Sequence, residues 1–235
     1  YSLSTTELPK KFIDSENHYA GFAARARVIM YRTDINTKYP LHLNDFLKEE
    51  SASNGIMAQP LTGTTLSNFA YLMQQNSPES TIKWFKDAEK AGITFASGNA
   101  DAMRRVCKGD FEWCFTDTDD AAKAIKNGYP VAIHFLDQGN KKNSGAMLIP
   151  NSICLIKGAE NNKLAHKFID FVLSPETETK LANSLSRQIP LNPKASIPEN
   201  MLKPYEDFQV LEIDWETTAV TLDDAAKIFQ RHFVN

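Results

Sequence analysis

From residue 55 onward, short apolar runs of strand length alternate with longer segments whose apolar residues recur at helical spacing. The runs predicted to be strands are 55–58, 93–96, 111–115 and 131–135. Strands and helices that follow one another in this way are typical of proteins in which helices cover a central sheet. We therefore predict an α/β fold, with further strands at 26–31, 146–149 and 153–156.

The clearest predicted helix runs over residues 78–91. Ser77 can cap its start, Pro78 occupies the first helical position, and Gly92 ends it. Its apolar stripe, which should face the core, consists of Ile82, Phe85 and Ala88. Further helices are expected at 40–48, 66–73, 99–108 with Asn99 as its cap, 118–127, 162–172, 175–185 and 222–233.

The balance of charge limits the partners of the chain. Its 26 basic and 29 acidic residues are mixed along the sequence and give a net charge of −3. Nucleic acids are bound through clustered positive charge, so we expect no nucleic-acid partner. No apolar run reaches the roughly 20 residues that a membrane-spanning helix needs. The chain starts at Tyr1 without Met or a basic leader, so we expect a processed chain or a fragment. Its first residues therefore cannot be used to assign a cellular compartment.

Common signatures of catalysis are missing from the sequence. It contains no GxSxG, HExxH, P-loop or GxGxxG motif, and its five histidines are scattered without the spacing of metal ligands. We therefore predict no catalytic residues and no enzyme. The three cysteines, Cys107, Cys114 and Cys154, are odd in number and lie among apolar residues, which favours buried thiols over disulfides.

A polar segment between a predicted strand and a predicted helix is the first candidate site. It consists of Thr62, Gly63, Thr64 and Thr65. The N–H groups at a helix start are unpaired and the helix dipole favours an anion there, while Gly63 lets a ligand approach the backbone. The hydroxyl groups add donors. The alternative is an ordinary Ser/Thr-rich helix cap.

Two further strand ends are polar in the same way, at 97–99 and at 116–120. Ligands of open α/β sheets bind outside the carboxyl ends of strands, so three such ends in succession predict a shared binding site. The third end contains Asp117, Asp119 and Asp120, and three acidic residues are more than a helix cap requires. The alternative is that Thr118 or Asp119 caps the helix and the other acids face solvent.

Arg25 and Arg27 flank Ala26 at the start of a predicted strand. Because side chains alternate along a strand, both guanidinium groups should lie on one face. This arrangement suits an anion or a carboxylate partner, and a structural salt bridge explains it equally well.

Six stretches, taken in order and spacing, resemble the ferric-ion-binding type of bacterial solute-binding protein over essentially the whole chain. They are GFAARARVIMY (21–31), PLTGT (60–64), KGDF (108–111), IKGA (156–159), AHKFIDFVLSPE (165–176) and IPLNP (189–193). The resemblance implies a two-lobed, hinged α/β fold of the type II periplasmic-binding-protein class, which closes around a small ligand. The family normally begins with strand–helix units that would precede Tyr1, so we expect an incomplete first lobe, made of 1–25 and 145–190, and a complete second lobe, made of 26–144 and 191–235.

The family's anion-binding positions carry over to this chain residue by residue. Thr62, Gly63 and Thr64 match its anion loop, Asn99 matches a side chain that touches the anion, and Arg25 matches an anchoring arginine. The family's adjacent iron-binding tyrosines are replaced by Asp119 and Asp120, with Asp117 in place of another polar contact. We add Thr65 and Thr118 to the expected ligand-binding set as neighbours within the same segments.

Carboxylates are hard oxygen ligands that can hold a metal ion, and they can also hold an ammonium group. The ligand is therefore left open between a metal ion, iron or another, with a synergistic anion, and an amine-bearing anion such as a phosphonate. The metal candidates are Asp117, Asp119 and Asp120.

The resemblance implies the substrate-binding component of a bacterial ABC importer, which captures a small molecule or ion and delivers it to a permease of the inner membrane. It further implies a monomer in the periplasm or on the cell surface as a lipoprotein. The alternative is the effector-binding domain of a transcription regulator, which shares this fold and would need a DNA-reading domain ahead of Tyr1.

Overall fold

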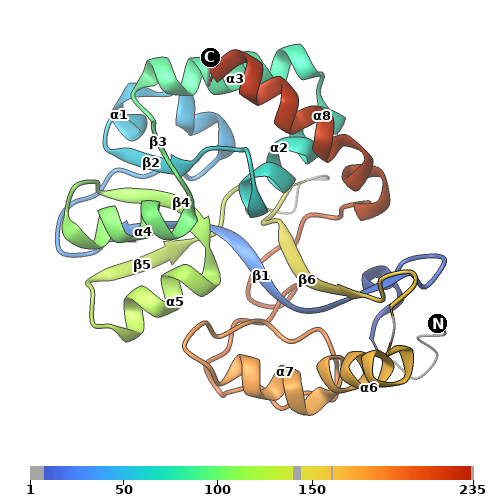
Figure 1. Ribbon diagram of the computed structural model, residues 1–235. Helices are drawn as coiled ribbons and strands as arrows, with labels where there is room; N and C mark the ends of the chain where they lie inside the picture. The colour runs from blue at the N-terminus through green and yellow to red at the C-terminus, as the bar shows by residue number, and fades with distance from the viewer. Residues whose placement is uncertain (1–7, 140–143, 160, 234–235) are drawn as a thin grey trace. The chain divides into compact units, whose positions relative to one another are not determined.

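The chain forms two compact units in the computed structural model, which describes residues 8–139, 144–159 and 161–233 (Figure 1). Unit 1 consists of Tyr1–Arg25 and Leu148–Lys203, and unit 2 consists of Ala26–Met147 and Pro204–Asn235. These borders differ from the predicted lobe borders in two segments. Residues 145–147 lie in unit 2, where Ala146 forms a β-bridge with Val210, and 191–203 lie in unit 1. The division into lobes made from the sequence stays a prediction.

The strands form one six-stranded sheet in which β1 runs from unit 1 into unit 2. Its order is β3-β2-β4-β1-β5, and β6 pairs with β1. The strands are β1 (Tyr19–Arg32), β2 (Gly55–Ala58), β3 (Thr94–Ala96), β4 (Trp113–Asp117), β5 (Val131–His134) and β6 (Leu148–Cys154).

Three neighbouring strands of unit 2 run parallel. β2 pairs in parallel with β3 and with β4, whereas β4 pairs antiparallel with β1. The carboxyl ends of β2, β3 and β4 therefore lie at one edge of the sheet. Each of these strands is followed directly by a helix, namely α2 (Gly63–Gln75), α4 (Asn99–Lys108) and α5 (Thr118–Lys126). This arrangement brings three helix starts to one edge.

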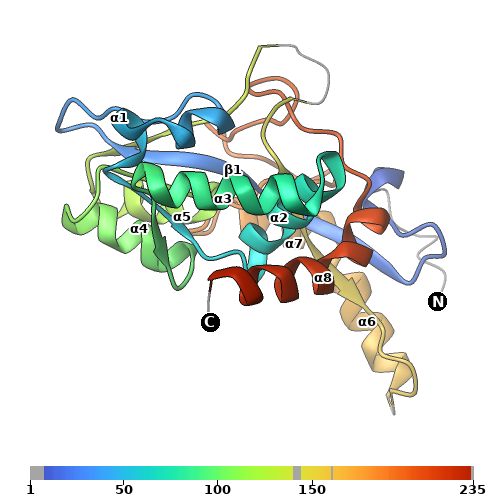
Figure 2. The ribbon, with the colours of Figure 1, turned by 90° about the horizontal axis from the view of Figure 1, so that it is seen from above.

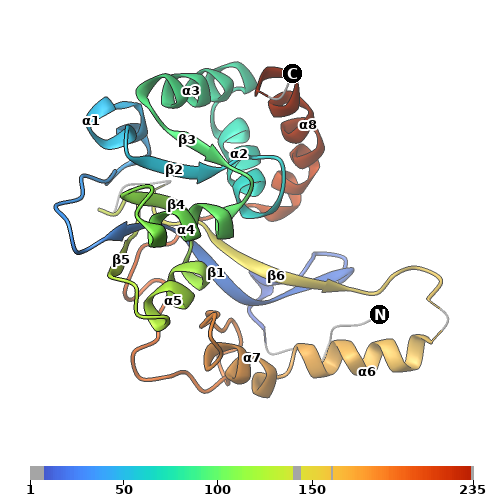
Figure 3. The same ribbon diagram turned by 60° about the vertical axis from the view of Figure 1, so that its left-hand side comes forward.

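Alternation along β4 separates two cores in unit 2. Trp113 and Phe115 pack into a cluster with side chains of α2, α3 (Pro78–Ala91) and α8 (Trp215–Phe233), and Cys114 packs with α4 and α5 on the opposite face. Figure 3 shows these helices around the strands of unit 2. Helix α8 contacts both α2 and α3 (Figure 2). Gly55 makes room for the first core, because a Cβ there would lie 2.1 Å from the ring of Trp113.

The predicted helix at 78–91 is confirmed with both ends correct. Ser77 accepts a hydrogen bond from the N–H of Ser80, and Gly92 ends the helix with a φ of 114°. Two other predictions were wrong. Helix α8 starts at Trp215, seven residues before the predicted 222, and β6 is one strand rather than two. The remaining elements, which connect the sheet in unit 2, are η2 (Leu43–Leu47) and α1 (Glu49–Ala52).

Unit 1 is organised around a buried carboxylate. Glu178 is fully buried and accepts hydrogen bonds of 2.7 Å from the N–H groups of Ala23, Leu191 and Asn192. Its remaining elements are η1 (Lys10–Phe12), α6 (Asn162–Val172) and α7 (Pro175–Ala182), which carries Glu178. Three apolar side chains of α6 are exposed, namely Leu164, Phe168 and Phe171.

Two sequence-based expectations concern the environment of the chain. Among the described residues, no helix has the length and apolar character needed to cross a membrane. The expectation of buried thiols holds for Cys114 and is wrong for Cys154, which is exposed at the end of the edge strand β6.

Candidate functional site

The three helices that follow the parallel strands of unit 2 begin without a side-chain cap. The N-cap residues Thr62, Gly98 and Asp117 make no capping hydrogen bond with their side chains. Helices α3 and α7, by contrast, are capped by the hydroxyl groups of Ser77 and Ser174. Uncapped helix starts present N–H groups and the positive end of the helix dipole to a ligand. The prediction that Asn99 caps α4 was wrong, because Asn99 is the first residue of the helix.

Glycines keep the space in front of two of these helix starts open. Gly63 has a φ of 62°, which residues with a side chain rarely adopt, and a Cβ placed on it would meet no atom within 4 Å. A Cβ on Gly98 would also meet no atom within 4 Å. A ligand atom can therefore approach the backbone at α2 and at α4.

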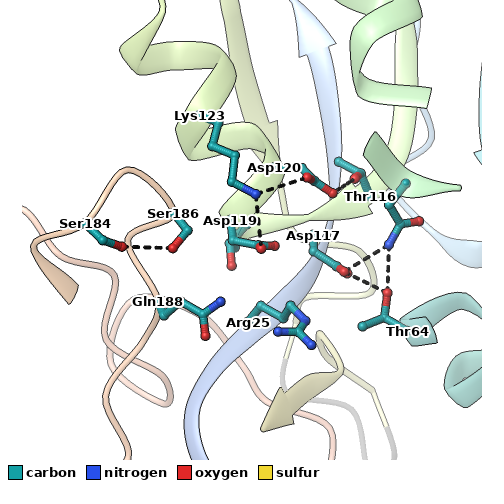
Figure 4. A network of polar contacts seen from close by, with 12 residues as sticks. Arg25, Thr64, Thr116, Asp117, Asp119, Asp120, Lys123, Ser184, Ser186 and Gln188 are labelled. Carbon is teal, nitrogen blue, oxygen red and sulfur yellow. Dashed lines mark hydrogen bonds and ion pairs between the residues drawn. The ribbon is translucent and has the colours of Figure 1, made fainter. Parts of the chain in front are cut away.

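Asp117 is the centre of a buried hydrogen-bond network at the carboxyl end of β4 (Figure 4). Its Oδ1 accepts a hydrogen bond of 2.9 Å from Nη1 of Arg27, and the side chain of Arg27 is 2% exposed. Its Oδ2 accepts from Oγ1 of Thr64 at 2.7 Å and from Nδ2 of Asn99 at 2.9 Å. Both carboxylate oxygens are thus occupied by donors of the protein.

The same network joins the starts of α2 and α4. Asn99 donates from Nδ2 to Oγ1 of Thr64 at 2.7 Å, and Thr65 donates from Oγ1 to Oδ1 of Asn99 at 3.1 Å. Arg27 also donates to Oγ1 of Thr64, at 3.2 Å. The hydroxyl of Thr64 therefore accepts two hydrogen bonds and donates one, which fixes its orientation.

A second group of charges lies along the first turns of α5. Lys123 places its Nζ 3.7 Å from Asp119 and 3.6 Å from Asp120, and Thr116 donates to Asp120 at 3.0 Å (Figure 4). Burial raises the pKa of Asp120 above its ordinary value, and the charge of Asp117 adds to this rise. The hydrogen bond from Thr116 and the charge of Lys123 act in the opposite direction. The buried carboxylates of Asp117 and Asp120 thus each lie next to a cation of the protein itself, namely Arg27 and Lys123.

The acids are close enough to act together on a cation. One oxygen atom from each of Asp117, Asp119 and Asp120 lies within 4.8 Å of the others. Carboxylate oxygens are ligands for hard metal ions. A metal ion bound by all three would compete with Arg27, Thr64 and Asn99 for the oxygen atoms of Asp117.

Most of the predicted site residues lie in unit 2, at the starts of α2, α4 and α5, and Arg25 lies in unit 1. Thr118 has a structural contact, because its Oγ1 accepts a hydrogen bond of 3.1 Å from the N–H of Ala26. Arg25 belongs to unit 1, where its Nη1 donates to Oδ1 of Asn151 at 2.7 Å. Sequence reasoning missed Lys123 and did not choose Arg27 over Arg25. Lys123 could have been found from its spacing, because it lies three residues after Asp120 and four residues after Asp119 on the same helix.

Comparison with known proteins identifies related sequences. The family model described as bacterial extracellular solute-binding protein matches residues 6–207. The major ferric iron-binding protein of Neisseria meningitidis serogroup A is 20% identical over 221 residues, which cover 93% of this chain and 66% of that protein. Iron uptake protein A1 of Synechocystis is 25% identical over 191 residues, which cover 76% of this chain and 52% of that protein. The chain thus spans about two thirds or less of the length of these relatives.

Solved structures share the fold of the chain. Apo ferric ion-binding protein A of Pasteurella haemolytica superposes with a TM-score of 0.81 at 17% identity, covering 97% of this chain and 73% of that one. The periplasmic binding protein AfuA of Actinobacillus pleuropneumoniae, solved with exogenous fructose-6-phosphate bound, gives the same TM-score at 16% identity and the same coverage. The predicted α/β, periplasmic-binding-protein-like fold is confirmed. The relatives named above bear the names of iron-binding, iron-uptake and periplasmic binding proteins and not of transcription regulators.

Proposed function

Because the chain belongs to the family of bacterial extracellular solute-binding proteins, we propose that it is the ligand-capturing component of an ABC importer and that unit 2 supplies an anion-binding site. Such a protein would work in the periplasm or at the cell surface and would deliver its ligand to a permease of the inner membrane. Its task is binding without chemical conversion, which agrees with a family of solute-binding proteins and with the absence of common catalytic motifs from the sequence.

The single observation that supports the anion site is the set of three uncapped helix starts at the carboxyl edge of parallel strands. The N–H groups of Gly63, Thr64 and Asn99 lie in the first turns of α2 and α4, next to glycines that leave the approach open. Helix starts of this kind bind phosphate, phosphonate and carboxylate groups through N–H donors and the helix dipole.

The carboxylates of Asp119 and Asp120 favour a ligand that also carries a positively charged group. Nζ of Lys123 lies 3.7 Å from Asp119 and 3.6 Å from Asp120, and both distances are longer than a strong hydrogen bond. An ammonium group of the ligand can therefore compete with Lys123 for these carboxylates. Asp117 already accepts hydrogen bonds from Arg27, Thr64 and Asn99, so we assign the positively charged group to Asp119 and Asp120. We infer an organic anion that carries an amine, such as an aminophosphonate.

A metal ion with a synergistic anion is the second candidate. The close approach of Asp117, Asp119 and Asp120 favours it, and so do the names of relatives that bind iron. Fe(III) is a hard ion that prefers anionic oxygen ligands, and segment 116–120 contains no tyrosine to supply a phenolate. The nearest tyrosine along the chain is Tyr129, which lies beyond the end of α5.

Calorimetric titration of the purified protein tests the proposal with three probes, which are 2-aminoethylphosphonate, inorganic phosphate and ferric citrate. We expect 2-aminoethylphosphonate to bind more tightly than phosphate, because only the first carries the amine. Asp119→Asn should weaken its binding by roughly 10- to 100-fold, the value of one hydrogen bond to a charged group. Ser77→Ala, which changes a helix start away from the site, is the matched control and should leave binding unchanged.

Two outcomes would contradict the proposal. If ferric citrate produces a visible absorption band that disappears when a tyrosine is replaced, the protein is a ferric carrier with rearranged ligands. If 2-aminoethylphosphonate and phosphate bind equally, and Asp119→Asn has no effect, the acids do not contribute to ligand recognition.

A further inference from the structure

Helix α6 of unit 1 has an apolar face that no described part of the chain covers. Leu164, Phe168 and Phe171 are 66%, 60% and 55% exposed. Their i, i+4 and i+7 spacing places them along one side of the helix, called the α6 face below. Figure 3 shows α6 next to α7, which it contacts. Single exposed apolar residues are common, whereas apolar side chains that adjoin one another on the surface indicate a binding partner.

The α6 face is distinct from the side of the helix that packs into unit 1. Ile169 and Val172 are 4% and 9% exposed, and each directly follows a residue of the α6 face. Consecutive residues of a helix are rotated by about 100°, so α6 has one apolar side in the core and a second one beside it. Packing into a single domain requires only the first side. The second side therefore has another role.

Lysines border the α6 face. Lys163 and Lys167 each directly precede one of its residues, so they lie on the flank away from the core. On the neighbouring helix α7, Nζ of Lys180 lies 6.0 Å from the ring centre of Phe171. Segment 157–180 contains four exposed lysines, and its exposed acids among the described residues are Asp170 and Glu176. The α6 face is thus surrounded by positive charge in a chain whose net charge is −3.

We propose that the α6 face binds the surface of a membrane that contains anionic lipids. The helix lies parallel to the surface, with its three exposed apolar side chains at the level where the acyl chains begin. The lysines extend their ammonium groups to the lipid phosphates, as long basic side chains do beside buried apolar neighbours. This binding involves no residue of the proposed ligand site, and it would hold the protein close to a permease in the same membrane.

A second copy of the chain fits the α6 face less well. Stable interfaces between proteins bury roughly 1,200 Å² or more, and three partly covered side chains on each copy supply less than that. Pairing the face with itself would also bring the lysines of two copies toward one another. An anionic surface instead matches both the apolar side chains and the charge around them.

Co-sedimentation of the full chain with lipid vesicles tests the proposal. Vesicles made of equal parts phosphatidylglycerol and phosphatidylcholine should bind the chain, and vesicles of phosphatidylcholine alone should bind it at least about tenfold more weakly. Binding to the anionic vesicles should weaken in about 0.5 M NaCl, which screens the charge of the lysines. Because the net charge of the chain is negative, general attraction to an anionic surface does not explain such binding.

Substitutions at exposed positions separate the apolar from the charged contribution. Phe168→Ser should weaken binding to the anionic vesicles at least about tenfold, because it removes apolar surface from the middle of the α6 face. Replacing Lys163 and Lys167 together by glutamine should weaken binding to the anionic vesicles and leave binding to phosphatidylcholine unchanged. Val220→Ser and Lys126→Gln are the matched controls, because both residues are exposed on unit 2.

Three results would overturn the proposal, namely that the chain binds neither kind of vesicle, that it binds both equally, or that Phe168→Ser binds like the wild type. A dimer in analytical ultracentrifugation that Phe168→Ser converts into a monomer would assign the α6 face to a second copy and would overturn it as well. Asp119→Asn, which changes the proposed ligand site, should leave binding to vesicles unchanged.

Discussion

Replacing Asp117 by asparagine tests how strongly the buried ion pair stabilises unit 2. The pair joins Nη1 of Arg27 to Oδ1 of Asp117 at 2.9 Å, and the two side chains are 2% and 5% exposed. Asn keeps the size of the side chain and a carbonyl acceptor but removes the negative charge. Arg27 then remains as a buried charge without a charged partner.

The expected loss follows from that uncompensated charge. Removing one partner of a buried ion pair costs about 3–5 kcal/mol of the free energy of unfolding. With a dependence on urea of about 2 kcal/mol/M, the unfolding midpoint should fall by roughly 1.5–2.5 M. The stacking of Arg27 over Phe115 is present before and after the change, so it does not offset the loss.

Tryptophan fluorescence during urea unfolding measures this effect in the relevant unit. All three tryptophans, Trp84, Trp113 and Trp215, belong to unit 2. Asp34→Asn is the matched control, because Asp34 pairs with Arg32 at 2.7 Å with both side chains partly exposed to solvent. Its midpoint should stay close to that of the wild type. Equal shifts in the two variants would refute the reasoning from burial.

Three more predictions concern packing, pH and the acids of α5. Gly55→Ala should cost about 3 kcal/mol because its Cβ would overlap the ring of Trp113. Gly98→Ala meets no atom and should lower the urea midpoint much less, by the equivalent of about 1 kcal/mol or below, because Ala is a poorer N-cap residue than Gly. Burial lowers the pKa of His134, so the folded state favours the neutral ring. The stability that the neutral ring contributes is complete above about pH 6.5 and is lost as the pH falls through the pKa of the folded state. His134→Gln should therefore flatten the change of the urea midpoint between about pH 7 and pH 5. Burial raises the pKa of Asp120, so the ionised form destabilises the fold, and Asp120→Asn should raise the urea midpoint at neutral pH by the equivalent of roughly 0.5–1 kcal/mol. A lower midpoint would show that its contact with Lys123 outweighs burial.

Local signals in the sequence predicted elements that local interactions determine. Helix α3 was predicted with correct ends because Ser77, Pro78 and Gly92 act through the backbone of the same segment. Helix α8 was predicted to start too late because the cap signal of Asp214 was overlooked, although its carboxylate accepts a hydrogen bond from the N–H of Thr217 at 3.1 Å.

Other features depend on contacts between distant parts of the chain. Pro150 indicated a break between two strands, but β6 passes through it, because β6 pairs with β1 alone and an edge strand tolerates a missing N–H donor. Asn is a residue type that often caps helices, but the side chain of Asn99 instead contacts Thr64 and Asp117, which are 35 and 18 residues away. The strand register that places Arg27 opposite Asp117 has no local signal in the sequence.

The central claim is that the helix starts of unit 2 bind the anionic group of a ligand through their backbone N–H groups. Amide chemical shifts during titration with 2-aminoethylphosphonate measure this directly. We predict saturable shifts for the N–H groups of Gly63, Thr64 and Asn99, which belong to uncapped helix starts, and none for the capped start of α3 at Glu79 and Ser80. Shifts confined to other residues, or equal shifts at the capped and uncapped starts, would contradict the account.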